Sequence, residues 1–467
     1  MPVRNLDAII KAYDVRGIYP DQLDETLARE VGGAFVRALG IAVRDGGPGA
    51  VVIGHDMRPS GPDLVASFAD GVMAQGCDVI LIGLASTDGL YFASGHLNLP
   101  GAMFTASHNP AQYNGIKLCR AGAAPVGQDS GLREIRAMID AGVPKYDGPM
   151  GNSSQQDVLT DYARHLRNLV DVSGIRPLRI VVDAGNGMAG FTAPAVLGEA
   201  AGLPALPLSI DALYFELDGS FPHHEANPID PENLRDLQAR VLATGADLGL
   251  AFDGDADRCF LVDERGEPVS PSALTALIAS RELAKNPGSV IIHNLITSKA
   301  VPEVVREFGG EPVRTRVGHS FIKARMAETN AVFGGEHSGH FYFRDFWRAD
   351  SGMLAALHAI AALGEASEGT TMSSLLAPFD RYPSSGEINT EVADQKKATQ
   401  AIADAFSSRA VEPLDWFDGM TVVGDRWWFN VRPSNTEPLL RLNVEADDHA
   451  MMESIRDEAL ALMRTGQ

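Results

Sequence analysis

One local pattern occurs three times along the sequence: a short apolar run, a polar turn, and then apolar residues at helical spacing. The three apolar runs lie at residues 50–54, 178–182 and 289–292. Short apolar strands that alternate with helices are typical of parallel sheets covered by helices on both faces. The repetition therefore predicts three similar α/β domains, each built on a mixed or parallel sheet.

Each of the three expected domains also carries a later apolar run that ends in an unusually polar loop. These loops lie at residues 105–110, 253–258 and 334–340. In open parallel sheets, ligands bind beyond the carboxyl ends of the strands. We therefore expect the three loops to converge on one central cleft.

The last hundred residues follow a different pattern. Two short apolar runs, at 420–423 and 427–431, flank a Gly–Asp turn, which predicts an antiparallel hairpin. A further strand is expected at 439–444, followed by a helix that ends near residue 463. This order of elements predicts an α+β domain that is distinct from the other three.

The domain boundaries follow from composition and from the repeat. Segments 143–156 and 364–373 contain the glycine, proline and serine typical of linkers. A further boundary near residue 255 rests on the repeat alone. A chain of 467 residues would suggest about three domains by its length, whereas the pattern indicates four. The expected domains are residues 1–150, 151–254, 255–368 and 369–467.

Composition excludes several classes of protein. Apolar residues make up 45% and charged residues 21% of the chain, which is ordinary for a globular protein. The 39 Lys and Arg against 61 Asp and Glu give a net charge of −22, which repels nucleic acids and anionic lipids. No apolar run is long enough to span a membrane, and Arg4, Asp7 and Lys11 interrupt any signal-peptide core. The three cysteines are too few for a disulfide framework and favour the cytoplasm.

Ser107 is the candidate nucleophile of the loop at 105–110. A serine hydroxyl is a weak nucleophile unless a base or a metal activates it. Asn109 and Pro110 make the loop turn-prone, so we expect Ser107 to be accessible. Adjacent side chains seldom face each other, which argues against a Ser107–His108 pair. Taken alone, a loop of this sequence is more commonly an ordinary surface turn than a nucleophile loop.

The loop at 253–258 carries three alternating carboxylates, those of Asp253, Asp255 and Asp257. Side chains that alternate along an extended loop can point into one hollow, where like charges need a cation to neutralise them. Hard oxygen ligands of this kind suit Mg²⁺. A calcium EF-hand is excluded, because Arg258 stands where that loop requires glycine. A solvated acidic loop is the remaining alternative.

Two further loops have the chemistry of sugar and phosphate binding. Glycines at 335–339 allow close approach of a ligand, while Glu336 and Ser338 offer partners for vicinal hydroxyls. The loop at 432–436 combines an arginine, which binds phosphate bidentately, with several small donors. Each loop alone is more commonly a turn or a capping cluster.

The four polar loops together, in this order, resemble those of the α-D-phosphohexomutase family. The resemblance runs from about Tyr13 to Arg441, and the segment 336–346 looks most like the phosphomannomutase branch. It implies an intramolecular phosphotransferase that interconverts mannose 6-phosphate and mannose 1-phosphate through a phosphoserine and a 1,6-bisphosphate. A phosphoglucomutase or dual-specificity mutase is the alternative. A phosphoglucosamine mutase, a sugar phosphatase and an inactive sugar-phosphate binder are less favoured.

The resemblance also assigns roles to individual residues. It implies that Ser107 carries the phosphoryl group and binds Mg²⁺ together with the three aspartates. It implies Lys117 as acid or base, with Arg16, His319 and His108 as further catalytic candidates. The substrate-binding residues that it implies are Tyr13, Arg258, Glu336, Ser338, Arg432, Ser434, Asn435 and Thr436.

The same resemblance implies hexose phosphates as the partners, glucose or mannose 1,6-bisphosphate as the activator, and a monomer or weak dimer. Two positions depart from the pattern of the family. Leu295 and Ile296 stand where some relatives have a basic residue, which argues against a phosphate contact from the third domain unless Arg316 substitutes. His337 replaces the usual Met or Leu, which bears on substrate preference.

Overall fold

The computed structural model describes residues 5–41, 49–434 and 439–464. It divides into two compact units, each described by itself. The first unit extends to Pro271 and includes Met326–Phe333 and Ser338–Leu375. The second comprises Ser272–Arg325, Gly334–His337 and the chain from Leu376 onward.

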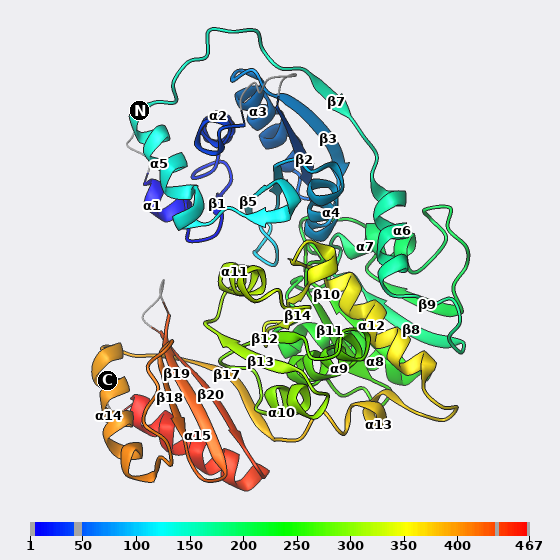
Figure 1. Cartoon of the computed structure of the whole chain (residues 1–467), viewed down its shortest axis with the longest axis vertical. Coiled ribbons are helices and arrows are strands. Elements are labelled where there is room, and N and C mark those ends of the chain that lie inside the picture. Colours follow the sequence, from blue (N-terminus) through cyan, green and yellow to red (C-terminus); the bar gives the residue numbers. More distant parts are fainter. Residues whose placement is uncertain (1–4, 42–48, 435–438, 465–467) are drawn as a thin grey trace. The chain divides into compact units, whose positions relative to one another are not determined.

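The first sheet, in unit 1, has seven strands in the order β1-β5-β4-β2-β3-β7, with β6 paired to β5 (Figure 1). Strand β2 pairs in parallel with β3 and β4, whereas β5 pairs antiparallel with β1 and β4, so the sheet is mixed. The strands are β1 Val15–Ile18, β2 Ala50–His55, β3 Asp78–Leu84, β4 Gly101–Phe104, β5 Tyr113–Arg120, β6 Ala124–Pro125 and β7 Ser153–Gln155. The helices are α1 Leu6–Ile9, α2 Glu25–Leu39, α3 Gly61–Met73, α4 Thr87–Leu97 and α5 Leu132–Ala141.

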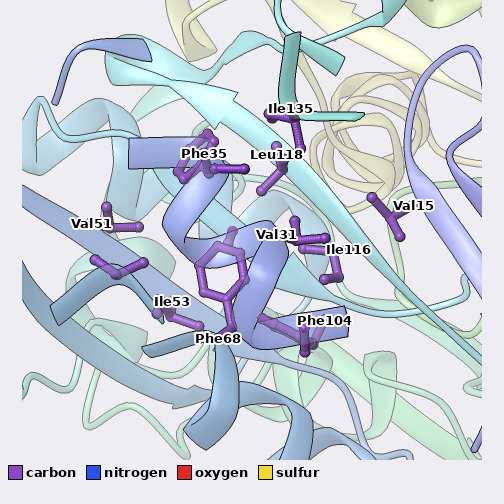
Figure 2. Packing of buried hydrophobic residues seen from close by; sticks show 14 of the residues in the cluster. Val15, Val31, Phe35, Val51, Ile53, Phe68, Phe104, Ile116, Leu118 and Ile135 are labelled. Carbon is purple, nitrogen blue, oxygen red and sulfur yellow. The ribbon is translucent and has the colours of Figure 1, made fainter. Parts of the chain in front are cut away.

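Apolar side chains of α2 and α3 bury one face of this sheet. Phe68 lies between Phe35 and Phe104 (Figure 2). Its ring centroid is 6.1 Å from that of Phe35 and 5.4 Å from that of Phe104. All three rings are fully buried, and burying a side chain of this size stabilises the fold by about 1.5–3 kcal/mol. Helix α2 begins where the Asp24 carboxylate accepts the Leu27 N–H, and it ends at Gly40 in a left-handed conformation.

The second sheet, also in unit 1, has the order β11-β10-β8-β9. Strand β8 pairs in parallel with β9 and β10, while β10 and β11 pair antiparallel. The loop at 253–258 therefore joins two adjacent antiparallel strands. The elements are α6 Leu159–Leu169, β8 Leu178–Asp183, α7 Ala189–Val196, β9 Leu208–Leu213, α8 Arg235–Thr244, β10 Leu248–Phe252 and β11 Cys259–Asp263.

The third sheet has the order β13-β12-β14-β15-β16. Strands β12 and β13 pair in parallel, and β15 and β16 form an antiparallel pair. The strands are β12 Val290–Asn294, β13 Glu311–Thr315, β14 Phe333–Gly335, β15 Phe341–Phe343 and β16 Ala349–Asp350. The helices are α9 Pro271–Lys285, α10 Ala300–Glu307, α11 His319–Thr329, α12 Gly352–Glu365 and α13 Met372–Leu376.

The fourth sheet, in unit 2, has the order β17-β20-β19-β18 and is antiparallel throughout. Its elements are β17 Ser384–Glu391, α14 Gln395–Phe406, β18 Met420–Val423, β19 Trp427–Pro433, β20 Leu439–Ala446 and α15 His449–Arg464. The predicted hairpin corresponds to β18 and β19. The predicted fold class, three α/β domains and a C-terminal α+β domain, is confirmed.

The linker expected at 143–156 differs from the structure at its end. Residues 153–155 form β7, which pairs in parallel with β3 and extends the first sheet. All three residues are exposed and polar, so no apolar alternation marked them as a strand. The domain boundaries stay predictions, and the division after residue 254 would separate the paired strands β10 and β11. Within the described parts of the chain, no helix is both long and apolar enough to cross a lipid bilayer.

Candidate active site

Ser107 lies in the loop between β4 and β5, in unit 1. The residue is 5% exposed, so the expectation of an accessible serine is wrong. The reason is the close approach of the acidic loop, because a Cβ on Gly254 would lie 2.4 Å from the Ser107 carbonyl oxygen. The Ser107 backbone has a φ of 50°, in the left-handed region that is uncommon for residues other than glycine.

The Ser107 hydroxyl contacts both an aspartate and its own neighbour. Its Oγ donates to Asp253 Oδ2 at 2.9 Å and lies 3.2 Å from His108 Nδ1. The expectation that the side chains of Ser107 and His108 would not face each other is therefore wrong. Neighbouring side chains diverge in an extended chain, whereas the left-handed backbone at Ser107 brings the two together.

The three aspartates form one buried cluster. At least one carboxylate oxygen from each lies within 4.8 Å of the other two, and each residue is at most 1% exposed. Two cations balance part of this charge. Lys117 Nζ donates to Asp255 Oδ2 at 2.7 Å and to Asp257 Oδ2 at 2.5 Å, while Arg258 Nε donates to Asp253 Oδ2 at 2.8 Å.

Burial and charge act in opposite directions on the pKa values of this cluster. Burial raises the pKa of Asp253, and Arg258 offsets only part of that rise. Burial also acts to raise the pKa of Asp255, but Lys117, the Thr87 hydroxyl and Arg258 together outweigh burial, so the net shift is downward. For Lys117 the two aspartates outweigh burial and hold its pKa well above the usual value, so Lys117 is a cation.

The cluster has the chemistry of a divalent-cation site. Asp255 Oδ1 and Asp257 Oδ1 are buried and accept no hydrogen bond from any residue that the structure describes. A buried acceptor without a donor is costly, and a metal ion would remove that cost. These carboxylates could therefore hold a metal ion, and an all-oxygen set suits Mg²⁺.

Of the other predicted residues of unit 1, Arg258 and His108 lie beside this cluster. Arg258 Nη2 donates to His108 Nδ1 at 2.6 Å, so this nitrogen carries a lone pair. Burial first, and then the charge of Arg258, hold the pKa of His108 well below its usual value, so the ring is neutral. Arg16 Nη1 donates to Asn109 Oδ1 at 2.6 Å. Tyr13 is half-buried, beside the start of β1.

His340 is a neighbour of the cluster that the sequence analysis did not select. Its Nε2 lies 3.7 Å from Asp257 Oδ1, and Asp257, His340 and Asp350 form a second group of possible metal ligands. Ser338 Oγ lies 3.0 Å from His340 Nδ1. His340 stands two residues after Ser338, the predicted sugar-binding serine, and this position in the sequence could have marked it as a candidate.

Glu336 belongs to unit 2, where it fixes the loop that precedes α11. Its Oε1 accepts the Gly318 N–H at 3.1 Å and the Asn294 Nδ2–H at 3.3 Å, and the residue is 2% exposed. His319 is half-buried and is the first residue of α11. The structure thus brings Glu336 and the loop at 318–319 together.

The predicted phosphate loop begins in the last two residues of β19, in unit 2. Arg432 Nη2 donates to Glu387 Oε2 at 3.2 Å, and Arg432 Nη1 lies 4.0 Å from Asp418 Oδ2. Ser434 is buried, and its N–H donates to the Leu439 carbonyl at 2.8 Å. Asn435 and Thr436 lie outside the residues that the structure describes.

Asp418 is a second residue that the sequence analysis missed. Its Oδ2 accepts the Val317 N–H at 3.0 Å and also faces Arg432. It therefore connects the loop at 316–319 with the end of β19 inside unit 2. No motif marks this residue, because its partners are a backbone N–H and an arginine far away in the sequence.

Comparison with known proteins identifies the family of the chain. The four domain profiles of phosphoglucomutase/phosphomannomutase match in order: α/β/α domain I at residues 7–144, domain II at 160–266, domain III at 270–382 and the C-terminal domain at 387–462. The chain belongs to the phosphoglucomutase/phosphomannomutase family. The predicted resemblance is thereby confirmed.

Full-length relatives agree with this membership. The phosphohexose mutases of Xanthomonas campestris pv. campestris are 42% identical over 97% of this chain and 98% of their own length. The phosphomannomutase of Escherichia coli strain K12 is 39% identical over 97% and 98%. A crystal structure of a phosphoglucomutase/phosphomannomutase family protein from Burkholderia thailandensis has a TM-score of 0.86 at 32% identity, covering 98% of this chain and 97% of that one.

The predicted enzyme class is confirmed by the same findings. The chain is a phosphohexomutase, an enzyme of intramolecular phosphoryl transfer. The roles of the individual site residues stay predictions.

Proposed function

We propose that this phosphohexomutase interconverts mannose 6-phosphate and mannose 1-phosphate through a phosphorylated Ser107 and an enzyme-bound 1,6-bisphosphate. The observation that carries the proposal is the hydrogen bond from Ser107 Oγ to Asp253 in a buried cluster of three carboxylates. An isolated surface serine would have neither a carboxylate partner nor a neighbouring cation-binding site. This environment suits a hydroxyl that gives and takes a phosphoryl group.

In the forward transfer, the bond between phosphorus and Ser107 Oγ breaks while a bond to the free sugar hydroxyl forms. Lys117 carries a proton because its pKa is raised, and it can give this proton to the leaving Ser107 oxygen. The sugar hydroxyl loses its proton to another basic group, for which His319 is the candidate because a neutral imidazole can accept a proton. Arg16 stays protonated, so its part would be to supply positive charge. In the return transfer, Ser107 attacks the other phosphate of the bisphosphate and its proton returns to Lys117.

Asp253, Asp255 and Asp257, together with Ser107, would hold Mg²⁺. When bound, the metal neutralises the charge that develops on the transferring phosphoryl group. Arg258 adds a fixed cation beside Asp253 and His108. These residues require no rearrangement during the transfer, which is the source of electrostatic catalysis.

Glu336 and Ser338 would bind the sugar hydroxyls, with Tyr13 as a further contact. Arg432, Ser434, Asn435 and Thr436 would bind the phosphate that is not reacting. Arg432 supports this role, because a nearly buried guanidinium can bind two phosphate oxygens in parallel. Exchange of its partner Glu387 for a phosphate would keep the charge of the arginine satisfied.

The preference for mannose follows the names of several relatives, such as the phosphomannomutase of Escherichia coli. A phosphoglucomutase or dual-specificity activity is the alternative, which the relatives named phosphohexose mutases leave open. We expect glucose 1,6-bisphosphate or mannose 1,6-bisphosphate as the activator, and a monomer or weak dimer in the cytoplasm. The three cysteines are free and buried, which agrees with a reducing compartment.

The test compares mannose, glucose and glucosamine 1-phosphates as substrates, and measures both the isomerised sugar and inorganic phosphate. We expect the highest turnover with mannose 1-phosphate and almost no phosphate release. Release of phosphate instead of isomerisation would identify a phosphatase. Equal rates with mannose and glucose would identify a dual-specificity mutase.

A further inference from the structure

The guanidinium of Arg58 holds the backbone of the Ser107 loop. Its Nη2 donates to the carbonyl oxygens of Ser107, at 2.9 Å, and Asn109, at 2.6 Å. Its Nη1 donates to the carbonyl oxygens of Pro110 and Tyr113, each at 2.9 Å. Four carbonyl groups between Ser107 and Tyr113, including that of Ser107 itself, are therefore fixed to one side chain.

Arg58 is itself fixed from behind. It follows β2, and its Nε–H donates to Asp56 Oδ2 at 3.2 Å, while its backbone N–H donates to Asp56 Oδ1 at 2.9 Å. A guanidinium has five N–H donors, so all five are used. Both residues are at most 1% exposed, and the Phe221 ring lies 5.2 Å from the Arg58 guanidinium carbon. A buried cation that is fully hydrogen-bonded has one orientation only.

The Ser107 loop needs such support because its backbone is unfavourable. Ser107 has a positive φ of 50°, where the side chain and the carbonyl group crowd each other. The Ser107 N–H is also held, by Thr105 Oγ1 at 2.9 Å, and Thr105 in turn hydrogen-bonds to Asp56. Asp56 therefore fixes the Ser107 N–H through Thr105, and Arg58 fixes the Ser107 carbonyl group.

We infer that Arg58 is a positioning residue for the nucleophile: it holds Ser107 in the left-handed turn that directs Oγ toward Asp253. This inference rests on the proposed role of Ser107 and deepens it. Arg58 touches neither the Ser107 hydroxyl nor the three carboxylates in any contact found among the described residues. Its effect on the reaction is thus through the backbone of the loop.

Arg167 provides a matched control in the same unit. From α6 it donates to the carbonyl oxygens of Val196, Pro204 and Gly198, at 2.8, 2.6 and 2.5 Å. It is also an arginine that holds a loop by its carbonyl groups, but that loop follows α7 and does not contain the nucleophile. If loss of support for any loop slowed the phosphorylation of Ser107, replacement of Arg167 would slow it as much as replacement of Arg58.

The experiment compares Arg58→Lys and Arg58→Met with Arg167→Met. Each folded variant is stripped of phosphate and mixed with saturating glucose 1,6-bisphosphate, and the phosphorylation of Ser107 is followed by rapid quench and intact mass. We expect a roughly hundredfold slower phosphorylation in the Arg58 variants, because small misplacement of a reacting group costs about that much. Lysine should not rescue, because a single ammonium cannot reach four carbonyls. The KM for mannose 1-phosphate should change little.

Arg167→Met should lower the melting temperature and leave the phosphorylation rate unchanged. A folded Arg58→Lys enzyme that is phosphorylated as fast as the wild type would overturn the inference. If both Arg58 variants fail to fold, Asp56→Asn removes the acceptor of Nε and keeps the four carbonyl bonds. That variant should then be phosphorylated more slowly at unchanged KM, and an unchanged rate would overturn the inference.

Failure of the proposed function gives a different result. If wild-type Ser107 never becomes phosphorylated, the proposed mechanism fails, whatever the Arg58 variants do. If the wild type is phosphorylated on Ser107 and only the Arg58 variants are phosphorylated slowly, both the role of Ser107 and the positioning role of Arg58 are supported.

Discussion

Replacement of Lys117 by methionine should destabilise the protein strongly when no metal is present. Lys117 Nζ contacts Asp255 and Asp257, which are almost completely buried. Removal of one partner from a buried ion pair leaves an uncompensated charge and costs about 3–5 kcal/mol. Here two carboxylates lose their shared cation, so we expect the upper part of this range.

Metal binding should reverse part of this loss. A cation in the cluster would replace the charge that Lys117 supplied, and a ligand at about 100 times its Kd stabilises a fold by roughly 2.7 kcal/mol. Mg²⁺ should therefore raise the unfolding midpoint more in Lys117→Met than in the wild type. Urea unfolding followed by circular dichroism, with EDTA or with Mg²⁺, measures both effects.

Lys285→Met is the matched control. Lys285 pairs with Glu282 at 3.1 Å; Glu282 is buried, but the Lys285 side chain is 47% exposed, so solvent screens its ammonium and the pair contributes about 1 kcal/mol. Its unfolding midpoint should change little in either condition. If Lys117→Met is as stable as the wild type in EDTA, or if Mg²⁺ stabilises both proteins equally, Lys117 does not compensate the charge of the two buried carboxylates.

Three further predictions concern stability, specificity and retention of the intermediate. Burial raises the pKa of the Asp88 carboxyl to about 6, so the folded protein holds this proton more tightly than the unfolded chain does. The resulting gain in the free energy of unfolding is complete below pH 4 and is lost as the pH rises through 6. Asp88→Asn should remove this pH dependence, which is worth about 3 kcal/mol, when unfolding is measured from pH 4 to 7. Glu336→Ala should reduce turnover of mannose and glucose phosphates alike, because a loop that hydrogen-bonds shared hydroxyls does not distinguish epimers elsewhere; loss with one epimer only would contradict this. Arg432→Ala should make activity depend more strongly on added glucose 1,6-bisphosphate, measured as initial rate after prolonged turnover, and an unchanged dependence would contradict its role in retention.

The chemistry of the site was largely readable from the sequence. The alternation of Asp253, Asp255 and Asp257 predicted one shared hollow, and the structure gathers their oxygens within 4.8 Å. The apolar runs at 50–54, 178–182 and 289–292 likewise predicted β2, β8 and β12 within a residue or two. These features are local, because each depends on the periodicity of a few consecutive residues.

Other features depend on contacts far apart in the sequence. The burial of Ser107 and its contact with His108 follow from a left-handed backbone and from the approach of Gly254, which no short motif encodes. Arg58 binds backbone carbonyl groups, which every residue has. The sequence around Ser107 therefore does not indicate that an arginine holds this loop. Strand β7 carries only polar, exposed residues, so its pairing with β3 had no apolar signal.

Turnover in the proposed mechanism depends on a phosphoryl group that Ser107 carries. The most direct test quenches the wild-type enzyme within milliseconds of adding mannose 1-phosphate and measures the mass of the intact protein and of its Ser107 peptide. We predict a phosphorylated fraction on Ser107 that falls as 1,6-bisphosphate forms and then recovers as mannose 6-phosphate appears, with neither signal in Ser107→Ala. Full turnover by an enzyme whose Ser107 stays unphosphorylated, with no bisphosphate or other phosphoryl donor present, would contradict the account.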